Sequence, residues 1–120
     1  MTNFKELLIW KKAFSIGLDV LNATKAFPKA ELYGLTSQVN RSAISIASNI
    51  AEGAGRGGNK EFNHFLNIAI GSSYELETQL MFAKELGYLT EATCDKMFDE
   101  IDHLQRMVRK FKLTLEPQLN

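Results

Sequence analysis

The chain has 120 residues, 45% of them hydrophobic and 23% charged, a composition that is typical of a globular domain and excludes a disordered or fibrous protein. Fourteen basic and fourteen acidic residues give a formal net charge of zero, so the total lacks the basic excess of many nucleic-acid-binding proteins. We expect a single domain over residues 1–120.

Hydrophobic periodicity predicts a first helix over about residues 3–27. It opens with Asn3 followed by Glu6, as in a capping box, and it ends before Pro28. Two adjacent faces of this segment are apolar, and a monomeric bundle rarely needs so wide an apolar face. We therefore expect self-association, with Trp10 and Phe14 as candidate interface residues.

A second helix is predicted over residues 33–54. Its alanines at positions 43, 47 and 51 form a ridge of small side chains, which permits a neighbouring helix to approach closely. The glycine-rich run at 53–58 ends this helix and predicts a tight reversal of the chain.

Two more helices follow, over about residues 59–86 and 90–115. Asn59 and Thr90 are suitable N-caps for them, and Gly87 marks the end of the first of the two. Because the connectors are short, consecutive helices should be antiparallel. The predicted fold is all-α: an up-and-down antiparallel four-helix bundle.

Motifs that resemble catalytic or ligand sites have simpler explanations. The run Gly53–Gly58 matches G-x-G-x-x-G, but a helix precedes it where a dinucleotide site needs a strand. No nucleophile turn or oxyanion hole is recognisable near the histidines or Cys94. We expect neither an enzyme nor a cofactor.

Two Glu-x-x-His pairs, Glu61 with His64 and Glu100 with His103, resemble the ligand motifs of di-iron bundles. In an antiparallel pair of helices the two motifs would lie on the order of 12 Å apart along the axis. They cannot share one pair of metal ions at that separation, so no metal site is expected.

A polar line follows one face of the second helix, and Arg41 in it should lie opposite about Ser72 of the third helix. Short Ser and Asn side chains are unusual on a purely exposed face. A solvated surface is the simpler alternative, but we favour a network withdrawn from solvent, within the bundle or between protomers. Its members are Arg41, Ser45, Asn49, Glu52, Tyr74, Glu75 and Glu77.

Several sequence blocks resemble one known family. They are RSAISIASNIAEG at 41–53, GSSYELETQL at 71–80 and LGYL at 86–89. With these blocks the chain resembles the four-helix-bundle family of 23S rRNA intervening-sequence proteins, which are also called S23-like. The family is related to the accessory variability protein of diversity-generating retroelements, a basic bundle that binds nucleic acid. The resemblance implies a protomer that assembles into a ring-like homopentamer.

Charge is distributed unevenly over the predicted bundle. The end that collects the start of the first helix, the 53–58 turn and the end of the last helix carries nine basic residues against four acidic ones. Helix-dipole complementarity explains part of this excess, in the last helix above all. The basic residues are candidate nucleic-acid contacts: Lys5, Lys11, Lys12, Arg56, Lys60, Arg106, Arg109, Lys110 and Lys112.

These features predict an oligomeric, non-enzymatic bundle whose basic end binds structured RNA or an acidic protein partner. The alternative is a structural scaffold that binds no nucleic acid. The N-terminus lacks a signal-peptide pattern, and no apolar run approaches the roughly 20 residues of a membrane span. With a lone Cys94, this favours the cytoplasm and no membrane contact.

Overall fold

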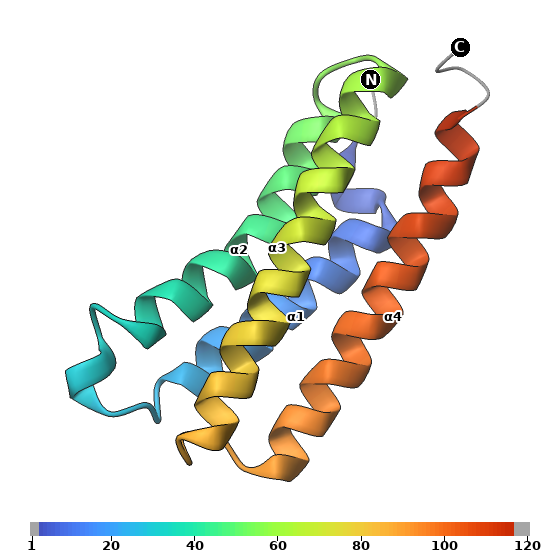
Figure 1. The fold of residues 1–120 in the computed structure, drawn as a ribbon. Helices are drawn as coiled ribbons and strands as arrows, with labels where there is room; N and C mark the ends of the chain where they lie inside the picture. Colours follow the sequence, from blue (N-terminus) through green and yellow to red (C-terminus); the bar gives the residue numbers. More distant parts are fainter. Residues whose placement is uncertain (1–2, 117–120) are drawn as a thin grey trace.

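Four long helices lie side by side in the computed structural model, which describes residues 3–116 (Figure 1). Residues 1–2 and 117–120, which the sequence assigned to the same domain, lie outside the described residues. All regular structure in the described part is helical. In chain order the elements are η1 (Phe4–Glu6), α1 (Leu8–Thr24), η2 (Lys29–Glu31), α2 (Leu35–Ala54), α3 (Asn59–Glu85) and α4 (Glu91–Leu115).

The core runs along the axis of the bundle and takes one apolar stripe from each helix. The most deeply buried large side chains are aliphatic, and each contributes about 1.5–3 kcal/mol by leaving water. α2 and α3 supply Ile46, Ile50, Leu66, Leu76 and Leu80; α1 and α4 supply Val20, Ile101, Leu104 and Val108.

The first helix is shorter than the sequence predicted. The Asn3 side chain does accept a hydrogen bond, from the Lys5 amide at 3.1 Å, but the element it caps is the short 3-10 helix η1. Leu7 is extended (φ −70°, ψ 129°), so the chain changes direction before α1 begins at Leu8. α1 also ends at Thr24, three residues before the predicted end.

The remaining helix ends follow the predicted signals closely. Gly57, between α2 and α3, and Gly87, after α3, both have positive φ (82° and 79°), a conformation that glycine adopts without strain. The Thr90 side chain accepts a hydrogen bond from the Thr93 amide at 3.1 Å and so caps α4. At α3 the residue before the helix is Gly58, and Asn59 is already its first residue.

Glycine also sets how closely α2 and α3 approach. A Cβ atom placed on Gly53 would lie 2.8 Å from Cβ of Phe65, so only glycine fits at this crossing. Farther along the same contact, the hydroxyls of Ser45 and Ser72 are 2.9 Å apart. These two contacts fix the register of the α2–α3 pair.

Cys94 lies at the other end of the bundle, near the start of α4. Its side chain is fully buried, and its thiol lies 3.9 Å from the carbonyl oxygen of Leu80 on α3. Burial raises the pKa of the Cys94 thiol. Over the described helices, no segment combines the length and hydropathy that crossing a membrane requires.

Candidate functional site

The candidate site lies at the end of the bundle where η1 and the start of α1 meet the α2–α3 turn and the end of α4 (Figure 1). The up-and-down order of the helices brings these distant parts of the chain together. The basic side chains expected at this end fall into two groups, according to whether a carboxylate neutralises them.

Three of the nine form ion pairs. Arg56 Nε lies 3.2 Å from Glu52 Oε2, and Arg106 Nε lies 3.1 Å from Asp102 Oδ2. Lys12 on α1 pairs with Glu100 on α4. The hydrogen bond from Lys12 lowers the pKa of the Glu100 carboxyl. Lys12 is therefore a bridge between helices and leaves little net charge for a ligand.

The other six have no carboxylate partner within residues 3–116. Four of them are exposed and extend into solvent: Lys5, Lys11, Lys60 and Lys110. The last two, Arg109 and Lys112, are held by neutral groups. This subset carries the positive potential of the basic end.

The neutral partners of Arg109 and Lys112 both belong to α3. Arg109 Nη2 donates a hydrogen bond to the Tyr74 hydroxyl, and its guanidinium carbon lies 5.9 Å from the centroid of the Tyr74 ring. Lys112 Nζ donates to Asn67 Oδ1. The line formed by these contacts between α3 and α4 is called the α3–α4 seam below. Neither pair is evident from the sequence, because the two partners are 35 residues apart in one pair and 45 in the other.

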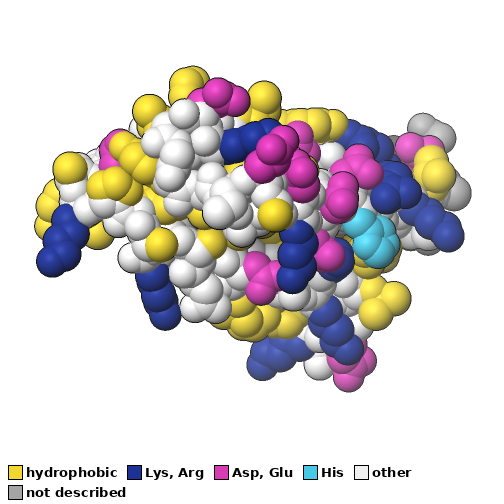
Figure 2. All heavy atoms as spheres, turned by 90° about the horizontal axis from the view of Figure 1, so that it is seen from below, with side chains coloured by type: hydrophobic (Ala, Val, Ile, Leu, Met, Phe, Trp, Pro, Cys, Tyr) yellow, Lys and Arg dark blue, Asp and Glu magenta, His cyan; other side chains and the backbone are white. Residues whose placement is uncertain are grey.

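The opposite end of the bundle has a different surface. Figure 2 views the whole molecule from below, and on the face that it shows acidic, basic and hydrophobic side chains are intermixed. Lys84 Nζ, for example, lies 3.8 Å from Glu91 Oε1. At this opposite end acidic residues outnumber basic ones, but basic side chains lie between the acidic ones, so the surface does not have a single sign of charge.

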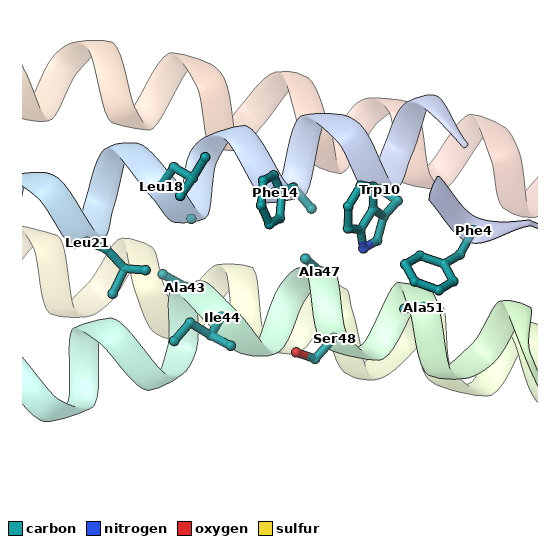
Figure 3. A pocket seen from close by; sticks show the side chains of 12 residues that line it. Phe4, Trp10, Phe14, Leu18, Leu21, Ala43, Ile44, Ala47, Ser48 and Ala51 are labelled. Atoms are coloured by element: carbon teal, nitrogen blue, oxygen red, sulfur yellow. The ribbon is translucent and has the colours of Figure 1, made fainter. Parts of the chain in front are cut away.

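A separate apolar groove of about 310 Å³ lies between α1 and α2 (Figure 3). Trp10 stacks on Phe14 with ring centroids 5.0 Å apart, and Phe4 meets Trp10 edge to face at 5.2 Å. The small side chains of Ala47 and Ala51 lie below them on α2. The predicted alanine ridge therefore faces α1 and forms the floor of this groove.

Comparison with known protein families identifies the chain. The model of the family described as 23S rRNA-intervening sequence protein matches residues 5–110. The chain belongs to this family. A comparison with curated proteins gives no match.

A solved structure supports the same fold. It is the crystal structure of a protein with unknown function from the S23 ribosomal protein family of Bacteroides thetaiotaomicron VPI-5482. The TM-score is 0.81 at 20% sequence identity, and the match covers 88% of this chain and 98% of that chain. At this identity the likeness shows the fold alone.

The polar line on α2 differs from the predicted network. Arg41 is exposed, and no hydrogen bond or ion pair holds it in the described structure. The hydroxyl of Ser45, four residues later, is the group that meets Ser72. The predicted register was therefore wrong by about one helical turn, because the α2–α3 reversal is centred later than expected.

Other members of the predicted network are also exposed in the protomer: Glu52, Tyr74 and Glu75. The hydrogen bonds that do form among these residues make a smaller network than predicted. The Asn49 amide donates to the Ser45 hydroxyl at 2.9 Å. On the other side of α3, the buried side chain of Gln105 donates to Glu77 Oε1, also at 2.9 Å. Burial of Arg41 between protomers stays a prediction.

The two Glu-x-x-His motifs lie on different helices, and they are not brought together. Among the described residues there is no group of three or more His, Cys, Asp or Glu side chains with the geometry of a metal site. Glu100 instead pairs with Lys12, and the His64 ring packs edge to face on Phe65 with centroids 5.4 Å apart.

Proposed function

We propose that this chain is a non-enzymatic cytoplasmic protein that assembles with copies of itself and binds structured RNA through its basic end. The observation that carries the proposal is the group of six basic side chains without carboxylate partners, among the described residues, in the half of the bundle that holds the α2–α3 turn. A site of this composition attracts phosphate groups, and it releases the counterions that phosphates hold in free RNA.

A net charge of zero does not oppose this binding, because the bundle is long compared with the range of electrostatic forces. The principal-axis extents of the molecule are 47 × 24 × 22 Å. At physiological salt, charges interact over about 8 Å before screening reduces their effect. A phosphate at the basic end is therefore affected chiefly by the charges of that end.

Self-assembly is supported by the groove between α1 and α2. Phe14, Leu18 and Ile44 remain 47%, 47% and 49% exposed beside it, and grouped apolar side chains of this kind favour association. The family resemblance implies a ring of five protomers. In a ring with cyclic symmetry all protomers point the same way, so their basic ends would lie on one side of it.

Binding of a stem-loop RNA at two salt concentrations tests the proposal. Phosphate contacts should weaken steeply between about 50 and 200 mM salt, a range over which such contacts cost orders of magnitude in affinity. The slope of the logarithm of the association constant against the logarithm of the salt concentration is negative. Lys60→Gln combined with Lys110→Gln should make this slope shallower by about two, since each lost phosphate contact removes roughly one unit.

Lys25→Gln combined with Lys29→Gln is the matched control, because both lysines are exposed at the opposite end. An equal loss of affinity in this control would contradict binding at the basic end. Binding of an acidic polypeptide but not of RNA would indicate a protein partner for the same surface.

The second candidate is a scaffold whose assembly is itself the function, and the apolar groove favours it. This alternative predicts a stable oligomer that binds no stem-loop RNA even at about 50 mM salt, where phosphate contacts are strong. Light scattering and the binding measurement together separate the two proposals.

A further inference from the structure

The α3–α4 seam combines an exposed aromatic ring with positive charge. The Tyr74 side chain is 46% exposed, and the Arg109 guanidinium lies beside its ring and bonds to its hydroxyl. A guanidinium held near an aromatic face keeps its charge and restricts the motion of both side chains. The pair thus forms a fixed, partly open platform.

The seam continues from this platform toward the basic end. Lys60, Asn67 and Tyr74 are spaced by seven residues, or about two helical turns, so they share one face of α3. Asn67 accepts a hydrogen bond from Lys112, and this leaves the NH₂ group of its amide as a donor. A strip of donors and cations therefore leads from the exposed Lys60 to the Tyr74 ring.

The cations within this strip have no competing carboxylate in the described part of the chain. Arg109 and Lys112 are positioned by a phenol and an amide, which do not neutralise them. Beyond Tyr74 on α3, Glu77 already accepts a hydrogen bond from Gln105 at 2.9 Å. A phosphate on Arg109 or Lys112 therefore displaces no ion pair.

We infer that the α3–α4 seam binds unpaired nucleotides of RNA, with a base stacked on Tyr74 and the backbone phosphates on Arg109 and Lys112. Proteins read single-stranded loops and ends by stacking bases on aromatic rings and guanidinium planes. A base inside a duplex keeps its own stacking partners and cannot offer its face to the ring. This inference rests on the proposed function and specifies which part of a structured RNA the protein contacts.

Binding of two RNAs at one salt concentration tests the inference: a single strand of about 12 nucleotides, within the site sizes that such surfaces cover, and a blunt duplex of the same length. Tyr74→Leu removes the ring but keeps apolar bulk, and it should weaken binding of the single strand by about 5- to 150-fold. The affinity of the Tyr74→Leu variant for the duplex should equal that of the wild type. Tyr74→Phe keeps the ring and should retain most of the affinity for the single strand.

Tyr33→Leu is the matched control, because the Tyr33 side chain is 94% exposed but lies in the connection before α2, at the opposite end. It should bind both RNAs as the wild type does, and far-ultraviolet circular dichroism should show equal helix content in all variants. Equal affinity of wild type and Tyr74→Leu for the single strand would overturn the inference and leave the proposed function intact. Failure of the wild type to bind either RNA would overturn both.

Discussion

Replacing Gly53 with alanine probes the close approach of α2 and α3. The added methyl carbon would lie 2.8 Å from Cβ of Phe65 and 3.0 Å from Cδ1 of Phe62. The Cβ atom of Phe65 is fixed to the backbone and cannot rotate away, so the two helices must separate. Overpacking of this kind costs about 1–3 kcal/mol.

The helical preference of alanine offsets part of that cost. It amounts to at most about 1 kcal/mol in a helix interior and is smaller at Gly53, the second-last residue of α2. We expect a net loss of about 1–2 kcal/mol. Gly71 is the matched control: it lies inside α3 and is exposed, and a methyl group added there would meet nothing within 4 Å. Gly71→Ala should raise the free energy of unfolding by about 0.5–1 kcal/mol.

Urea unfolding followed by circular dichroism measures both effects. The midpoints should move in opposite directions with an unchanged m value. All samples need the same protomer concentration, because association shifts the apparent stability. If Gly53→Ala proves as stable as Gly71→Ala, the α2–α3 approach is looser than described, and the register argument based on it fails.

Three further predictions concern the interior, the α1–α4 contact and the groove. Gln105→Ala should lower the free energy of unfolding by about 1–3 kcal/mol in urea, because it removes a side chain that is only 4% exposed and strands its hydrogen-bond partners on α3. Glu100→Gln should cost under about 1 kcal/mol at neutral pH, because its pair with Lys12 is partly exposed. Since Lys12 lowers the folded-state pKa of Glu100, that contribution is present above the unfolded pKa and is lost as the pH falls through the folded one, so wild type and variant should converge in acid unfolding curves. Phe14→Asp should reduce the mass per particle in light scattering while helix content is retained; an unchanged mass would place the interface elsewhere.

The sequence predicted the helices well where single residues mark their ends. Gly57, Gly87 and Thr90 each act through their own backbone or side chain, so local reasoning suffices. The start of α1 was missed because one extended residue, Leu7, separates η1 from α1. The periodicity of apolar residues is judged over many residues, so it does not reveal that a helix is interrupted at a single residue.

The site was predicted less completely, because charge pairing depends on register between helices. The sequence placed nine basic residues at one end, but it could not show that Lys12 reaches Glu100 across 88 positions. It assigned Tyr74 to a network with Arg41, whereas the ring lies on the α4 side of α3, beside Arg109. An error of one turn in register is enough to exchange such partners.

Because Cys94 is buried, the reactivity of its thiol reports local opening of the bundle. The chain has one thiol, and thiol reagents attack the ionised form, which here is suppressed by burial as well as shielded. A reagent can therefore modify the native protein only when the start of α4 moves away from Leu80. The labelling rate in native buffer, divided by the rate for the unfolded chain, gives the population of that opened state. If this population is measured with and without RNA, the difference shows whether a ligand at the basic end also reduces local opening at the start of α4.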